Sequence, residues 1–293
     1  MAKTRKKTSG KVPAVTPCSR CPLRKLDIFR KFTAEELAFV SSFKSGELVL
    51  EAGSTIFSEG TNSPHLYTVL SGWTFKYKTL EDGRRQVLNF ALPGDFIGLQ
   101  ASIFDTIGHS VEALTDVVLC VFPREKLWTL YEKHAGLAFD LTWLGAREES
   151  ILGEYLITVG QRRAGERIAF VLLHLFQRAR QLGLAGGNTL TLPLTQELLA
   201  DTIGFSLVHT NKTLKQLRKT GAFKWTGSTF ELVDEKKLAA MVGHIAPVGG
   251  VRPFICSREA ASWLEPLILA SSLPVPAASA AMSAAVWRSP GAT

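Results

Sequence analysis

The sequence predicts an α+β protein in which an antiparallel β-roll precedes a long helix, and short helices with a hairpin follow. Three observations predict this order. Glycines interrupt short β-rich runs between Gly46 and about Phe122, an apolar stripe with helical spacing follows Pro123, and a glycine separates two helical segments beyond Leu192. A chain of 293 residues is long enough for two domains of ordinary size, each with its own core.

Composition restricts the class of protein and its location. Apolar residues make up 46% of the chain and charged residues 20%, which is typical of a globular protein rather than a disordered or collagen-like one. Four cysteines are too few for a disulfide-stapled secreted scaffold. No apolar run approaches the roughly 20 residues of a membrane span, and no apolar core follows the basic N-terminus as in a secretory signal. We therefore expect a cytoplasmic protein without membrane contact.

Residues 1–25 form a basic arm that carries the motif Cys18-Ser19-Arg20-Cys21. The arm holds eight basic residues and no acidic one, and it accounts for the whole net charge of +8, because 34 − 8 leaves 26 basic against 26 acidic residues. We expect residues 1–16 to be a solvated, disordered segment. A weak contact with nucleic acid is the alternative interpretation, but the arm alone does not establish DNA binding.

Residues 26–135 are expected to form the β-roll. Glycine accepts the positive φ of tight turns, so its regular recurrence between β-rich runs indicates a closed antiparallel roll. Asp82-Gly83 is a strong hairpin signal, and the apolar run Val117–Phe122 would close the barrel.

Residues 136–160 are expected to form one long helix. Its apolar stripe, at three- and four-residue spacing, includes Leu144, Leu152, Leu156 and Val159, and Glu148 and Glu149 are set into it. Such a seam on a helix between two domains favours a parallel contact with a second copy, so we expect a homodimer. The alternative is that this face packs on the β-roll of its own chain.

Residues 161–243 are expected to form a winged helix-turn-helix domain. Thr195 and Ser206 are good N-caps for two short helices, Gly204 supplies the turn between them, and a hairpin follows from Phe223. The second helix is basic and lacks acidic residues, which suits the phosphate backbone of double-stranded DNA. The alternative is an ordinary helical hairpin with a solvated basic face. The expected DNA-contacting residues are Ser206, Val208, His209, Asn211, Lys212, Lys215 and Arg218.

Residues 244–293 form a tail in which alanine, proline and serine predominate. We expect it to be disordered apart from a short helix around Arg258–Leu269, and we expect Cys256 to take no part in a site.

The three parts, in this order, resemble the Crp–Fnr superfamily of bacterial transcription regulators over about residues 18–243. The motifs that carry the resemblance are Leu70-Ser71-Gly72, Leu92-Pro93-Gly94-Asp95-Phe96-Ile97-Gly98, Glu166-Arg167 and Ile203-Gly204-Phe205-Ser206. The resemblance implies a β-roll of the cyclic-nucleotide-binding type, a homodimer, a palindromic operator and RNA polymerase as a partner. An enzyme is not expected, since no Ser/His/Asp or paired-carboxylate constellation stands out.

The resemblance to the cyclic-AMP-binding branch weakens at the loop Gly98–Val111. His109-Ser110 stands where that branch has Arg-Ser, and no arginine occurs between Arg85 and Arg124. A phosphate pocket without its guanidinium loses its bidentate partner, so cyclic nucleotide is not the expected ligand. A regulator gated by another small effector in the β-roll, with no metal cofactor, remains the alternative function.

The closer resemblance is to the oxygen-sensing Fnr branch, in which four cysteines hold a [4Fe-4S] cluster. Cys18, Cys21 and Cys120 match three of those positions, and Asp27 falls where the remaining cysteine would be. Carboxylate is a harder ligand than thiolate, so the implied cluster would be labile. The CxxC motif is also compatible with a redox dithiol or a zinc half-site, and Cys120 with a packed strand residue. The expected function is therefore regulation by oxygen or redox state.

The resemblance also suggests how DNA is read. Where the family places a Glu and an Arg near the start of the recognition helix, this chain has Val208 and Lys212, with His209 and Asn211 beside them. Asparagine can pair with adenine and lysine with guanine, whereas valine can meet only a thymine methyl group. We expect a half-site that differs from the family's usual ones.

Overall fold

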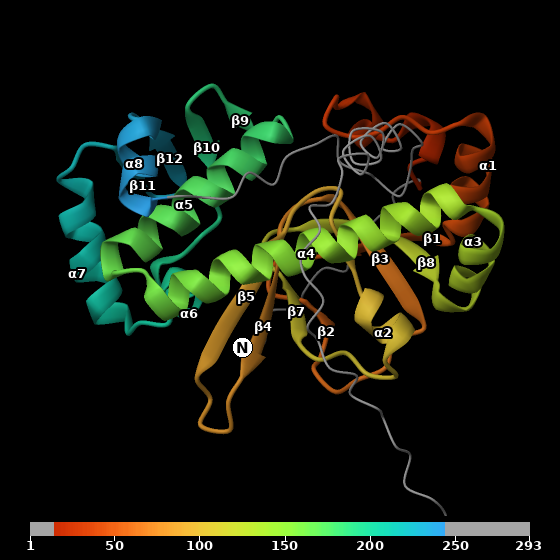
Figure 1. The fold of residues 1–293 in the computed structure, drawn as a ribbon, viewed down its shortest axis with the longest axis horizontal. Coiled ribbons are helices and arrows are strands. Elements are labelled where there is room, and N and C mark those ends of the chain that lie inside the picture. The colour runs from red at the N-terminus through yellow and green to blue at the C-terminus, as the bar shows by residue number, and fades with distance from the viewer. Residues whose placement is uncertain (1–14, 244–293) are drawn as a thin grey trace, which may run out of the picture. The chain divides into compact units, whose positions relative to one another are not determined.

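The computed structural model describes residues 15–243, and Figure 1 shows the order of its elements. The predictions for residues 1–14 and for the tail from residue 244 onward, including Cys256, fall outside the described residues. The predicted fold class is confirmed: a β-roll, a long helix and a winged helix-turn-helix follow one another along the chain.

The segment that carries the CxxC motif is folded. Two short 3₁₀ helices, Cys18–Arg20 and Pro22–Lys25, lead to helix α1, Ala34–Phe43. Buried side chains of this segment, Leu23 and Phe29 among them, belong to the main hydrophobic core. Phe29 packs so closely on Gly94 that a Cβ there would lie 2.4 Å from the ring, and the φ of +86° also requires glycine. This packing joins the N-terminal segment to the roll.

The β-roll consists of two antiparallel sheets of four strands each, in the orders β1-β8-β3-β6 and β2-β7-β4-β5. Cys120, on β8, lies opposite Thr68 on one side and Glu47 on the other, so it is held in the middle of its sheet. The predicted hairpin at Asp82-Gly83 joins β4 to β5, with φ of 85° at the glycine. The strands are β1 Gly46–Leu50, β2 Thr55–Phe57, β3 His65–Ser71, β4 Thr74–Thr79, β5 Arg85–Ala91, β6 Phe96–Ile97, β7 Ser110–Ala113 and β8 Val117–Pro123, with helix α2 at Leu99–Ile103.

Helices connect the roll to the second domain. A 3₁₀ turn, Arg124–Lys126, precedes helices α3 Leu127–Lys133, α4 Ala135–Gln161 and α5 Ala164–Gln181. Helix α4 corresponds to the predicted long helix. One face of α5 is almost wholly buried. No helix within residues 15–243 is both long and apolar enough to cross a membrane.

The second domain is built on a sheet in the order β11-β12-β10-β9. The three signals predicted around its turn are confirmed: the Thr195 hydroxyl accepts the Leu198 N–H, Gly204 has φ of 73°, and the Ser206 hydroxyl accepts the His209 N–H. The elements are β9 Ala185–Gly186, β10 Thr189–Thr191, α6 Gln196–Ile203, α7 Leu207–Arg218, β11 Phe223–Thr226, β12 Thr229–Leu232 and α8 Glu235–Val242.

Candidate functional site

Helix α7 presents one polar face to solvent. Thr210, Thr213, Leu214 and Leu217 anchor its other face in the domain core. The seven residues expected to contact DNA all lie on the exposed face: Ser206, Val208, His209, Asn211, Lys212, Lys215 and Arg218. Val208 is 80% exposed, so its apolar side chain is available for contact with a partner. The face therefore has the charge and the exposure that a DNA groove requires.

The predicted dimer seam on α4 divides between two faces. Leu144 is buried in the chain's own core, whereas Leu152 and Leu156 are 37% and 71% exposed, and Val159 is half-buried. Helical spacing alone does not separate residues that pack on the roll from residues that stay exposed. The exposed residues, Leu156 above all, are the part of the stripe that a second copy can reach.

The two glutamates of the seam also differ. Glu148 accepts from Lys76 Nζ at 2.8 Å and from the Asn89 amide at 3.3 Å. Burial acts to raise the pKa of Glu148, but the Lys76 ammonium holds it below the ordinary value. Glu149 is exposed. The charge of Glu148 is thus compensated inside the chain, and Glu149 is the glutamate that borders the exposed seam.

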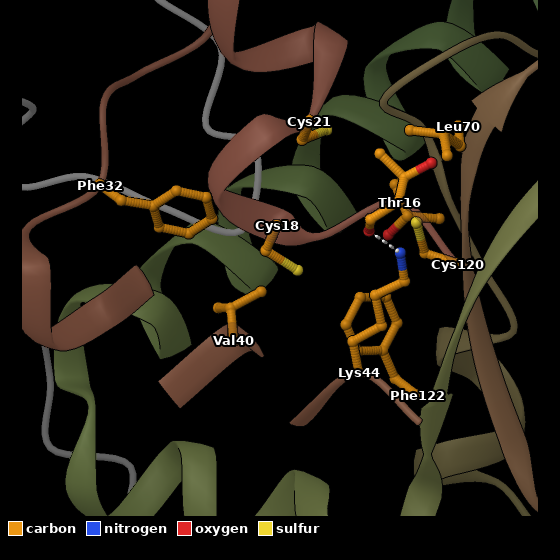
Figure 2. Close-up of a pocket in the computed structure, with 10 residues that line it drawn as sticks. Thr16, Cys18, Cys21, Phe32, Val40, Lys44, Leu70, Cys120 and Phe122 are labelled. Carbon is orange, nitrogen blue, oxygen red and sulfur yellow. Dashed lines mark hydrogen bonds between the residues drawn. The ribbon is translucent and has the colours of Figure 1, made fainter. Parts of the chain in front are cut away.

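The three cysteines of the described chain gather at one place. Cys18 and Cys21 from the N-terminal segment and Cys120 from β8 line a cavity of about 20 Å³, and Lys44, the residue that follows α1, also lines it. Figure 2 shows the side chains around this cavity. The Lys44 ammonium donates to Glu47 at 2.6 Å and to the Thr16 carbonyl at 2.8 Å. We call this group the cysteine cavity.

Burial controls the ionisation of the thiols in the cysteine cavity. It raises the pKa of Cys21, and it raises the pKa of Cys120 to about 12, although the Lys44 ammonium beside Cys120 acts to lower it. Burial acts to lower the pKa of Lys44, but the hydrogen bond to Glu47 and the charge interactions with Cys120, Glu47 and Cys18 together raise it. At neutral pH the cavity therefore holds a charged ammonium and protonated thiols at Cys21 and Cys120.

A second cavity, of about 400 Å³, lies between the roll and α4. Gln100 and His109, the polar residues of the predicted effector loop, both line it. Burial and the Lys76 ammonium lower the pKa of His109 to about 4, so the imidazole is neutral and does not replace a guanidinium. We call this space the roll cavity.

Two cations of the roll cavity were not found from the sequence. Arg147 comes from α4 and pairs with Asp95 at 3.1 Å, and Lys76 comes from β4 and pairs with Glu148. Neither cation lies in the loop Gly98–Val111, and no local sequence pattern links that loop to positions on β4 and α4. Both cations already have carboxylate partners, which limits their availability to an anionic ligand.

Comparison with known proteins identifies the family. A family model of the cyclic nucleotide-binding domain matches residues 47–134, and one of the Crp-like helix-turn-helix domain matches residues 166–241. Over 225 residues the chain is 31% identical to the nitrogen fixation regulation protein FixK of Bradyrhizobium diazoefficiens, a match that covers 76% of this chain and 93% of that protein. The chain belongs to the Crp–Fnr superfamily of transcription regulators.

Further relatives agree with this membership. The transcriptional activator protein FnrL of Cereibacter sphaeroides is 28% identical over 232 residues, which cover 78% of this chain and 92% of that protein. The solved structure of FixK2 from Bradyrhizobium japonicum matches with a TM-score of 0.62 and 26% identity, covering 68% of this chain and 98% of that one. This Crp–Fnr protein is therefore a DNA-binding regulator and not an enzyme, as predicted.

The four-ligand set that the Fnr-branch resemblance implied is not assembled in this Crp–Fnr regulator. Asp27 is exposed and does not line the cysteine cavity, which leaves three sulfur ligands. The cavity has room for about one water molecule, and Lys44 places a positive charge beside Cys18 and Cys120. Within residues 15–243, no group of three His, Cys, Asp or Glu side chains is placed to hold a metal ion. The described arrangement does not fit an iron–sulfur cluster.

Proposed function

We propose that this Crp–Fnr regulator adjusts its DNA binding to redox state through the thiols of Cys18, Cys21 and Cys120. The observation that carries the proposal is the cysteine cavity, where residues about a hundred positions apart in the sequence line one space. Cysteine is frequent as a lone core residue, but three in one cavity offer partners for oxidation.

The reaction is a two-electron oxidation of two thiols to a disulfide. Hydrogen peroxide is the oxidant we name: two thiols lose two protons and two electrons, a sulfur–sulfur bond forms, and the peroxide is reduced to two water molecules. A disulfide between Cys120 and either N-terminal cysteine would tie the N-terminal segment covalently to β8. Reduction by a dithiol would reverse the step.

The N-terminal segment has a route to the long helix. Nine residues beyond Cys21, the buried guanidinium of Arg30 donates to Glu36 at 2.9 Å and to Asp140 of α4 at 3.0 Å. A displacement of the segment therefore pulls on a buried carboxylate of α4. Separating buried, hydrogen-bonded ionic groups is strongly destabilising, so the N-terminal segment and α4 are expected to move together.

The proposed assembly is a homodimer on a palindromic operator. The exposed face of α4, with Leu152, Leu156 and Glu149, is the surface that a second copy would cover. A two-fold dimer places one α7 in each of two successive major grooves, about 34 Å apart. DNA as the ligand implies the cytoplasm as the location and RNA polymerase as a further partner.

The test is operator binding by the full chain after treatment with hydrogen peroxide and again after dithiothreitol. We expect a reversible change that is lost in Cys120→Ser and retained in Cys256→Ser, which serves as the matched control. An unchanged affinity after oxidation would contradict the proposal. Protein purified without oxygen is expected to contain neither iron nor acid-labile sulfide, and stoichiometric amounts of both would favour the cluster instead.

The roll cavity supports a second candidate, a regulator gated by a small effector. The specific observation is that Asp95, at the cavity wall, pairs both with Arg147 of α4 and with Arg178 of α5. A ligand that displaces the Arg178 pair would act directly on α5, the helix that begins the DNA-binding domain, and one that displaces the Arg147 pair would act on α4. In that case Arg147→Met would change operator binding, whereas oxidation of the thiols would leave it unchanged.

A further inference from the structure

Arg167, from the Glu166-Arg167 motif, joins three segments of the chain. Its Nε donates to the carbonyl of Arg162, the residue that follows α4, at 2.8 Å, and its Nη1 donates to the carbonyl of Ile203 at 3.0 Å. The guanidinium also lies over the Phe205 ring, 4.5 Å from its centre. Ile203 is the last residue of α6, and Phe205 lies in the turn before α7.

The chemistry of these contacts suits arginine. The last carbonyls of a helix have no partner within the helix, and a cation at that end complements the helix dipole. A flat guanidinium can donate along its edge and stack through its face at the same time, which an ammonium cannot do. At the end of α6, Arg167 donates a hydrogen bond to Ile203 and lies over the Phe205 ring. These two contacts restrain both the position and the orientation of the turn.

The contacts continue into the recognition helix. The Phe205 ring packs against the His209 imidazole, with 4.6 Å between ring centres. His209 lies in the first turn of α7, on the exposed face. Side-chain contacts thus run from Arg167, on the half-buried face of α5, through Phe205 to His209 on the exposed face of α7.

The turn has a second anchor, on the roll. Gln86, on β5 of the roll, donates to the carbonyl of Thr202 at 3.0 Å. Between these two anchors Gly204 has φ of +73°, a conformation that L side chains rarely adopt. The carbonyls of Thr202 and Ile203, which precede Gly204, thus both accept hydrogen bonds. The direction in which α7 leaves the turn therefore depends on where Arg167 holds Ile203 and Phe205.

We propose that Arg167 is a positioning residue for DNA reading, which sets the angle of α7 without touching DNA itself. Hydrogen bonds to base edges require placement within a fraction of an ångström, whereas attraction to phosphates tolerates displacement. Loss of Arg167 therefore weakens discrimination between sequences more than it weakens general attraction to DNA. The inference uses DNA binding by α7 and is independent of the thiol proposal.

The experiment compares affinities for two DNA duplexes, measured with the full chain under reducing conditions. One duplex is the operator that the wild type selects from a random pool, and the other is an unrelated sequence of equal length. For Arg167→Gln we expect the ratio of the two affinities to fall about tenfold or more, with the salt dependence of non-specific binding unchanged. Phe205→Leu should have the same effect, and Phe205→Tyr, which keeps the ring, should retain the wild-type ratio.

Arg180→Gln is the matched control. Arg180 is on the same helix, lies 5.5 Å over the Phe176 ring and pairs with Glu235, but it does not contact the turn. A wild-type ratio in both Arg167→Gln and Phe205→Leu would overturn the proposal. An equal fall of both affinities would also overturn it, because lost folding or a lost phosphate contact gives that result. Failure of the wild type to select any operator would instead count against DNA binding by α7.

Discussion

The guanidinium of Arg85 on β5 and the carboxylate of Asp201 on α6 form an ion pair at 2.8 Å. Arg85 is held in place by the rings of Phe75 and Tyr77, which it covers at 5.4 and 5.3 Å. Together with the bond from Gln86 to Thr202, this pair fastens a hairpin of the roll to the helix that precedes the recognition helix. The β-roll and the helix-turn-helix domain of one chain are therefore in direct polar contact.

The Arg85–Asp201 pair should contribute modestly to stability. Its side chains are 29% and 25% exposed, so water screens part of the attraction. A double-mutant cycle with Arg85→Gln and Asp201→Asn, followed by urea denaturation, should give a coupling free energy of about 0.5–1 kcal/mol. Strict additivity of the two substitutions would show that the pair does not hold the domains together.

Asp140 should make stability depend on pH. Burial raises the pKa of Asp140 to about 7, although the Arg30 guanidinium acts to lower it. Because the folded protein binds this proton more tightly than the unfolded chain does, the contribution is full below about pH 4 and is lost as pH rises to about 7. The free energy of unfolding should fall over that range, by at most about 1.4 kcal/mol per pH unit.

Asp140→Asn provides the comparison. The variant removes the titration, so its free energy of unfolding should vary less between pH 4 and 7 than that of the wild type. Urea denaturation at several pH values measures both profiles. Parallel profiles would mean that Asp140 is already ionised at pH 4.

Two residues of α7 should read bases. Asn211→Ala and Lys212→Ala are each expected to weaken operator binding by about 1–3 kcal/mol and to relax specificity at one base pair. Lys215→Ala should weaken binding to all sequences and reduce the salt slope by about one. Titrations with single-base operator variants measure both effects. If all three variants behave like Lys215→Ala, these side chains contact only phosphates.

The two glutamates of α4 should affect dimerisation differently. Glu149→Ala removes a charge that would repel its counterpart beside the exposed seam, so sedimentation should shift toward dimer. Glu148→Ala should not cause this shift, because Lys76 already compensates that charge inside the chain. Leu156→Asn should shift the equilibrium toward monomer. A monomer–dimer constant unaffected by both Glu149→Ala and Leu156→Asn would place the interface elsewhere.

Cys120 should react slowly with iodoacetamide. With a pKa of about 12, its thiolate fraction at pH 8 is on the order of 10⁻⁴, and the rate should rise about tenfold per pH unit between pH 7 and 9. Lys44→Met should slow the reaction further, because the Lys44 ammonium favours the thiolate. Mass spectrometry of the labelled peptide measures the rate. Labelling of folded protein as fast as of urea-unfolded protein would contradict the burial of Cys120.

Local chemistry allowed much of the fold to be predicted. Caps and turns need particular side chains at particular positions. The sequence therefore indicates the start of α6 at Thr195, its end at Gly204 and the start of α7 at Ser206. Contacts between distant segments carry no such signal. The Arg30–Asp140 pair joins residues 110 positions apart, and Arg147 reaches the roll cavity from another element.

The differences at the site have the same origin. The family resemblance set Asp27 beside the cysteines, but a position in the sequence does not say whether a side chain faces a cavity or solvent. Likewise, the sequence does not divide the apolar stripe of α4 into buried and exposed residues, because that division depends on which residues the roll covers. Cys120 was linked to the CxxC motif only through the family resemblance, since no periodicity relates residues a hundred positions apart.

The thiols of the cysteine cavity are protonated and enclosed, and this would also determine how long an exposure to oxidant must last before the regulator responds. A reaction that depends on a scarce thiolate is slow compared with the lifetime of a brief oxidant pulse. Short pulses would pass before a disulfide accumulates, while sustained exposure would convert the population. A regulator built in this way averages the oxidant concentration over time, and the genes that it controls would follow the duration of a stress rather than its momentary peak.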